Sequence, residues 1–179
     1  MEIIAIIAAL ALLGLLLSRR GWVSVPGRSV HVIDGDTFSI TMRKQSIGRP
    51  PALRIRPIGY DSPEMGQAGG REAATALRTL LKGGLRIKLV GIDPYGRELA
   101  IVRIGEDGRG GDLAARMVLD GHGWPDRDGG LRVKASGLLA RFSGRGLWRG
   151  TLLGMGAVHP STFRKVNELR GTPPWERRR

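Results

Sequence analysis

The pattern of apolar and polar positions changes period along the chain, and its first clear feature is a hairpin. Val30–Ile33 and Phe38–Met42 are short runs of β-forming residues on either side of Asp34-Gly35-Asp36. Because Asp-Gly favours a tight turn between two strands, this arrangement predicts a β-hairpin. A third strand is expected over Leu53–Ile58. Pro57 has no backbone N–H to donate, so it predicts a bulge or an edge position in that strand.

The rest of the pattern predicts two more strands and three helices. Leu85–Leu89 alternates apolar and polar residues, as a strand with one wet face does, and Leu99–Ile104 is a largely apolar fifth strand. Apolar residues at helical spacing predict helices within residues 73–81, 113–118 and 131–142, the second capped by Asp112. The fold class is therefore mainly β with helices. The order of elements is compatible with a five-stranded Greek-key barrel of the oligonucleotide-binding (OB) type plus three α-helices.

A hydrophobic helix is expected before this domain. Ile3–Leu17 is an uninterrupted run of fifteen Ile, Ala, Leu and Gly residues, followed by Ser18-Arg19-Arg20. Its length lies between that of the apolar core of a signal peptide and that of a helix that spans a membrane. Glu2 is the only charged side chain before the run, and no Ala-x-Ala site follows it. These features favour a retained membrane anchor over a cleaved signal peptide.

The same pattern divides the chain into four parts. Residues 1–20 form the expected anchor or signal, 21–28 a linker, 29–149 the folded domain, and 150–179 a basic, weakly structured tail. The tail lacks clear periodicity and is interrupted by Gly and Pro. No internal repeat is visible.

The net charge of the chain indicates which classes of partner it binds. Among 179 residues, 29 are Lys or Arg and 16 are Asp or Glu, a formal net charge of +13. Such a balance favours polyanions, either nucleic acid or an anionic membrane surface. The chain has no cysteine, which excludes disulfides, thiol catalysis and thiolate zinc sites.

Three polar segments join or end the predicted strands and carry the candidate chemistry. They are Asp34-Gly35-Asp36-Thr37, Leu53–Glu64 with its two arginines, and Asp93-Pro94-Tyr95-Gly96-Arg97. Carboxylates can hold a hard cation, and an arginine can grip a phosphate with two parallel hydrogen bonds. Each segment alone has an ordinary explanation as a turn, a strand exit or a surface ion pair. Together they predict a site that cleaves phosphodiesters.

At these three segments, in this order, the sequence resembles the staphylococcal-nuclease (thermonuclease) family, over roughly residues 28–148. The resemblance implies a five-stranded barrel with three helices and calcium-dependent hydrolysis of phosphodiester bonds in DNA and RNA. Two aspartates and one backbone carbonyl hold the ion in that family, at positions that match Asp36, Asp61 and Ser62. A serine replaces the usual threonine, which matters little if only its carbonyl is used.

The resemblance also implies the catalytic residues. The family's glutamate, which activates or positions the attacking water, matches Glu64, and its two phosphate-gripping arginines match Arg56 and Arg97. Water attacks in line, the 5′-oxygen leaves, and a 3′-phosphate end results.

Further substrate contacts are expected around these groups. Tyr95 is expected to contact the phosphate or only to pack, and Arg54 shares a strand face with Arg56, where it extends the groove or is simply solvated. The family's type member has tyrosines after its second helix that help to hold the base. Here that region contains Trp124, which offers a replacement stacking surface.

Other functions and the membrane side stay open. The main alternative function is that of a non-catalytic OB module that only binds nucleic acid at the membrane surface. A weaker alternative is a basic scaffold that binds lipid or acidic polysaccharide. That function leaves the paired aspartates unexplained. The positive-inside rule applied to Arg19-Arg20 places the domain in the cytoplasm. Low cytosolic calcium and the danger of a non-specific nuclease to its own genome favour the extracytoplasmic side, which is the expectation adopted. If residues 1–20 are cleaved, the protein is secreted. No protein partner is predicted.

Overall fold

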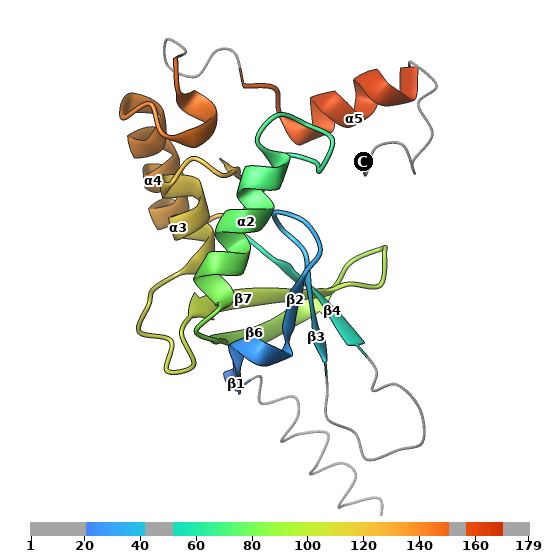
Figure 1. Ribbon diagram of the computed structural model, residues 1–179, viewed down its shortest axis with the longest axis vertical. Helices are drawn as coiled ribbons and strands as arrows, with labels where there is room; N and C mark the ends of the chain where they lie inside the picture. The colour runs from blue at the N-terminus through green and yellow to red at the C-terminus, as the bar shows by residue number, and fades with distance from the viewer. Residues whose placement is uncertain (1–20, 42–51, 151–156, 170–179) are drawn as a thin grey trace, which may run out of the picture.

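A curled six-stranded sheet forms the centre of the computed structural model, which describes residues 21–41, 52–150 and 157–169 (Figure 1). Across the sheet the order is β1 (Val23–Val25), β6 (Leu85–Ile92), β7 (Glu98–Ile104), β4 (Ala52–Pro57), β3 (Phe38–Thr41) and β2 (Val30–Val32). Neighbouring strands are antiparallel except for β4 and β7, which are parallel. The fold is thus mainly β with helices, as predicted.

All five predicted strands are present, and the hairpin has the expected partners, with Val32 opposite Phe38. The sheet nevertheless has six strands and not five. The additional strand β1 lies within the predicted linker, where Val23 pairs with Ile87. Its three residues, between Trp22 and Pro26, are too few to show a period of two, so the linker prediction for 21–28 is wrong in this part.

Pro57 occupies a different position from the one expected. β4 lies between β7 and β3, so it is a central strand, and Pro57 is its last residue. The ladder continues one residue later, where the Ile58 N–H donates to the Ala100 carbonyl at 2.9 Å. A proline at the end of the strand removes a donor without opening the middle of the sheet.

The described residues include four α-helices: α2 (Gly70–Leu81), α3 (Leu113–Leu119), α4 (Leu131–Phe142) and α5 (Pro160–Leu169). The first three match the predictions, and Asp112 caps α3 by accepting a hydrogen bond from the Ala115 N–H at 2.8 Å. α2 packs on β2 and α3, and α3 packs on α4 and β7. In Figure 1, α3 and α4 lie to one side of α2 and α5 lies to the other.

α5 falls inside the segment predicted as a weakly structured tail, so that prediction is wrong for residues 160–169. Pro160, the first residue of the helix, is its only buried residue. Phe163, Val166 and Leu169 follow Pro160 at helical spacing, but they are half-buried or exposed, so the helix has few core contacts. The useful signal was Pro160 itself, because proline is favoured at the first helical position.

Two hydrophobic clusters stabilise the fold. The larger lies between the sheet and helices α2 and α3 and contains fully buried side chains such as Phe38, Ile55 and Leu77. The smaller joins Trp124, Ala140 and Trp148, the last of these in the 3₁₀ helix η2 (Gly146–Trp148). Over the described ranges no helix combines the length and apolar character that crossing a membrane requires, and the apolar run Ile3–Leu17 lies outside those ranges.

Candidate active site

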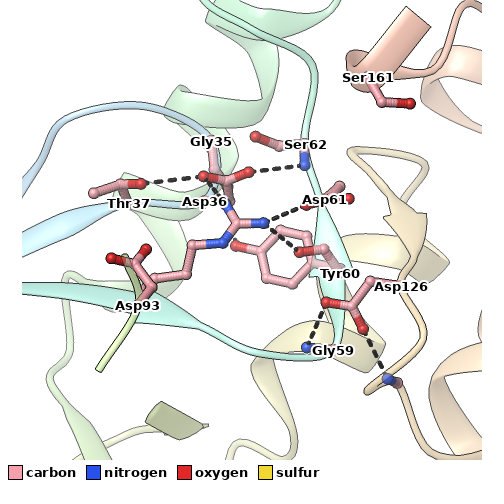
Figure 2. A network of polar contacts seen from close by, with 12 residues as sticks. Gly35, Asp36, Thr37, Gly59, Tyr60, Asp61, Ser62, Asp93, Asp126 and Ser161 are labelled. Atoms are coloured by element: carbon pink, nitrogen blue, oxygen red, sulfur yellow. Dashed lines mark hydrogen bonds and ion pairs between the residues drawn. The ribbon is translucent and has the colours of Figure 1, made fainter. Parts of the chain in front are cut away.

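The centre of the site is the guanidinium group of Arg56, which forms ion pairs with Asp36 and Asp61 (Figure 2). Arg56 lies on β4 next to Ile55, whose side chain is fully buried, so the alternation of the strand turns Arg56 away from the core. Asp36 comes from the β2–β3 turn and Asp61 from the short strand β5 (Tyr60–Asp61). Three segments distant in sequence thus meet at one cationic group.

The charges of this cluster support one another. Burial alone would raise the pKa of Asp36, but the charge and N–H donors of Arg56, with hydrogen bonds from Ser62 and Thr37, hold it below its usual value. Burial would lower the pKa of Arg56, yet Asp36 and Asp61 raise it above the ordinary value. The ionised pairing is therefore the stable state of the folded protein at neutral pH.

The β2–β3 turn fixes the position of Asp36. Its carboxylate Oδ2 accepts a hydrogen bond from the Ser62 N–H at 3.1 Å, and its own N–H donates to Asp34 Oδ1 at 3.0 Å. Gly35 permits this approach, because a Cβ there would lie 2.5 Å from Ser62 Oγ. Burial and the charge of Asp36 raise the pKa of Asp34 to about 6. Asp34 thus supports the turn.

A chain of hydrogen bonds connects Arg97 to the same cluster. Arg97 Nη1 donates to Thr37 Oγ1 at 3.0 Å, and the Thr37 hydroxyl donates to Asp36 Oδ1 at 3.1 Å. Asp93 Oδ2 accepts from Arg97 Nε at 2.7 Å and so orients the guanidinium. The centre of the Tyr95 ring is 5.5 Å from Arg97 Cζ, and the ring is 82% exposed. Tyr95 is therefore free to meet a ligand at Arg97.

Glu64 lies outside this network. Its carboxylate forms an ion pair with Arg164 of α5, and its backbone N–H donates to Gln67 Oε1 at 3.2 Å. The side chain is 37% exposed. The loop after β5 thus presents Glu64 to solvent beside the Asp36–Arg56–Asp61 cluster, in contact with the C-terminal helix and not with the two other arginines.

The structure argues against the expected stacking surface at Trp124. Its ring is only 5% exposed and packs edge-on against Trp148 and His159, at centroid distances of 5.6 and 5.3 Å. Trp124 lies in the two-residue strand β8 (Trp124–Pro125), opposite Asp61 of β5, so it supports the site from behind. Arg54, by contrast, is exposed and shares the outward face of β4 with Arg56, as predicted.

Comparison with known proteins identifies the family. No family model matches the chain. The chain is 31% identical to a protein of Shigella flexneri named micrococcal nuclease, over 129 residues that make up 69% of this chain and 71% of that protein. The chain belongs to the micrococcal nuclease-like family. It is also 28% identical over 169 residues to Protein ParB of Escherichia coli, covering 91% of this chain and 92% of that protein.

The oxygen ligands of this micrococcal nuclease-like chain fit a hard cation. The carboxylates of Asp36 and Asp61 come from different segments and already meet at one positive charge, that of Arg56. Ser62 follows Asp61 directly, and its N–H contacts Asp36. In the described part of the chain no three His, Cys, Asp or Glu side chains gather at metal-binding distance. An ion held by Asp36 and Asp61 would therefore need backbone and water oxygens as its other ligands, a set that suits calcium better than softer metals.

Four supporting residues were missed from sequence: Thr37, Tyr60, Asp126 and Arg164. Asp126 accepts hydrogen bonds from the N–H groups of Gly59 and Gly129, at 3.1 and 2.8 Å, and so ties the β4–β5 turn to the segment after β8. Thr37 lies within a recognised motif, which was a usable signal. Tyr60, Asp126 and Arg164 each connect to the site through a residue 25 to 100 positions away, which a local pattern does not reveal.

Replacing Tyr60 by phenylalanine is expected to destabilise the site without touching its charges. The buried Tyr60 hydroxyl donates to the Gly35 carbonyl at 2.9 Å, so its loss leaves that carbonyl unsatisfied in the core. The expected drop in the free energy of unfolding is about 1–2 kcal/mol, measured by urea denaturation. Tyr95→Phe removes a hydroxyl from an exposed ring and serves as the matched control. Equal stability of both variants would contradict the structural role of the Tyr60 hydroxyl.

Proposed function

We propose that this protein is a calcium-dependent nuclease that hydrolyses phosphodiester bonds of DNA, RNA or both and leaves 3′-phosphate ends. The observation that carries the proposal is the convergence of Asp36, Asp61, Arg56 and Arg97 in one hydrogen-bonded cluster. Membership of the micrococcal nuclease-like family supports the same class of reaction. A module that only binds nucleic acid has no need of paired carboxylates beside two arginines, which makes it the weaker alternative.

In this mechanism, Asp36, Asp61 and the carbonyl of Ser62 would hold the calcium ion. A calcium ion held there would supply Lewis-acid polarisation of the phosphoryl group, which favours attack by water. Arg56 and Arg97 bind the phosphate with their planar N–H donors and stabilise the negative charge that grows on it in the transition state. Asp93 and Thr37 orient Arg97 for this task.

Glu64 positions the attacking water and accepts its proton. It is three residues from Asp61 in the sequence and remains accessible to solvent, as a group that handles water must be. Before it acts, its carboxylate has to leave Arg164 or share that contact with the water. The pair is half-exposed, so breaking it costs only about 0–1 kcal/mol, a small barrier compared with the chemical step.

The test is cleavage of single-stranded and duplex DNA by the purified full chain, first in calcium and then with a chelator. Calcium-dependent cleavage that leaves 3′-phosphate ends is expected, and Asp36→Asn should abolish it. Glu106→Gln, a change of similar size in an exposed loop, should leave it intact. Tight, salt-sensitive binding with no cleavage in any divalent metal would overturn the proposal in favour of the binding module.

We also propose that the nuclease domain is tethered by the run Ile3–Leu17, with the domain on the extracytoplasmic side. The tether is supported by the apolar sequence and the absence of a cleavage motif. The side is supported by low cytosolic calcium and the danger of a non-specific nuclease to its own genome, against the positive-inside rule at Arg19-Arg20. Deletion of residues 1–20 should move the protein from the membrane fraction to the soluble fraction. Protease added to intact cells should digest the domain of the full chain. A domain protected from that protease would reverse the sidedness.

A further inference from the structure

A cavity of about 650 Å³ lies next to Glu64 and is not used by the proposed mechanism. Its walls come from the loop before α2, the turn after α3, η2 and the C-terminal segment that contains α5. The side chains important here are Gln67, Glu72, His122, Leu147, Arg149 and Phe163. A volume of this size falls in the ordinary range of small-ligand sites.

Two contacts connect the cavity to the catalytic loop. Gln67 accepts a hydrogen bond from the Glu64 N–H at 3.2 Å, and its amide nitrogen donates to the Val158 carbonyl. Phe163 precedes Arg164, whose guanidinium pairs with the Glu64 carboxylate. A ligand in the cavity therefore shares its walls with the residue proposed to position the attacking water.

The walls combine apolar faces with a polar edge. Phe163 and Leu147 supply apolar surface, and Leu147 reaches the loop because Gly69 has no side chain: a Cβ there would lie 2.5 Å from Leu147 Cδ2. Gln67, Glu72 and His122 supply hydrogen-bonding groups. Burial lowers the pKa of His122, which favours the neutral ring with one donor and one acceptor nitrogen. A nucleobase has the same character, with flat apolar faces and a polar edge.

A phosphate is a poorer match to this cavity. Glu72 would repel it and offset the attraction of Arg149, the one cationic residue among the described ones in the wall, and the apolar walls do not compensate a charge taken out of water. The groups proposed to bind phosphate, Arg56 and Arg97, do not line the cavity and belong to the cluster around Asp36. The ring expected to stack on a base, Trp124, is buried, so base contacts have to come from elsewhere in the chain.

We propose that this cavity receives an unpaired nucleobase of the strand whose phosphate is bound at Arg56 and Arg97. The inference rests on the proposed function, because it requires a nucleic acid ligand. It adds a base-binding subsite in which Phe163, from a helix outside the barrel, forms the stacking surface.

The experiment separates base contacts from backbone contacts. The full chain is titrated, in chelator, with a short fluorescein-labelled single-stranded oligonucleotide and with an abasic strand of the same length. Stacking of a base on an aromatic side chain contributes about 1–3 kcal/mol, so Phe163→Ala should raise the Kd for the base-containing strand by roughly 5- to 150-fold. The Kd for the abasic strand should not change. Phe163→Tyr should retain the wild-type Kd because it keeps a ring.

Leu169→Ala is the matched control, because Leu169 lies on the same helix, is 88% exposed and does not line the cavity. It should leave both Kd values unchanged. The proposal is overturned if Phe163→Ala weakens both strands equally, or neither. DNA cleavage in calcium is measured in parallel. If the protein binds bases through Phe163 but cleaves no DNA, the proposed nuclease activity is contradicted and the proposed base-binding subsite is not.

Discussion

Replacing Glu64 by glutamine is expected to lower the rate of DNA cleavage in calcium by on the order of 10²- to 10⁴-fold, because an amide cannot take a proton from the attacking water. The change is nearly isosteric. It removes one half-exposed ion pair, with Arg164, whose loss costs about 0–1 kcal/mol. The fold should therefore survive, and the loss should appear in kcat with little change in oligonucleotide affinity.

Two controls make this result specific. Arg164→Gln removes the same ion pair and leaves the carboxylate in place, so it should change the rate by no more than about fivefold. Glu106→Gln makes the same chemical change in an exposed loop and should have no effect. If Glu64→Gln and Arg164→Gln reduced kcat equally, the ion pair and not proton transfer would explain the loss.

The parts of this site that sequence predicts are those set by local chemistry. The β2–β3 turn follows from Asp-Gly between two β-forming runs, and its geometry places Asp36 on Ser62. The outward direction of Arg54 and Arg56 follows from the period of β4 around buried Ile55. In each case neighbours within a few residues determine the conformation, so a single sequence carries the information.

What sequence did not predict depends on contacts over long distances in the chain. Trp124 looked available for stacking, but Trp148 and His159 pack against its ring after the chain returns through η2. The contact between Glu64 and Arg164 joins residues 100 positions apart, through a helix with almost no buried face. Such packing is decided by the whole fold and leaves no periodic trace in the segments that take part.

Replacing Arg56 by glutamine is expected to affect both stability and catalysis. Removing one partner of a buried ion pair costs about 3–5 kcal/mol, because the other charge stays buried and uncompensated. The side chains are still 15% exposed at Arg56, 13% at Asp36 and 25% at Asp61. Because water reaches them in part, we expect a loss of unfolding free energy near the lower end of this range, at about 3 kcal/mol. Loss of a donor to the transition state should lower kcat by on the order of 10²- to 10³-fold. Arg54→Gln, on the same exposed face of β4, should change stability by less than about 0.5 kcal/mol.

Calcium should restore part of the stability lost in Arg56→Gln. In the wild type, a cation competes with the Arg56 guanidinium for Asp36 and Asp61, whereas in the variant both carboxylates lack a counter-charge. A ligand that binds only the folded state stabilises it in proportion to its affinity, about 2.7 kcal/mol at a hundredfold excess over Kd. The rise in Tm on adding calcium should therefore be larger for Arg56→Gln than for the wild type, and Asp61→Asn in the same background should cancel it. An equal rise in all three proteins would mean that calcium binds elsewhere and that these carboxylates serve only to hold Arg56.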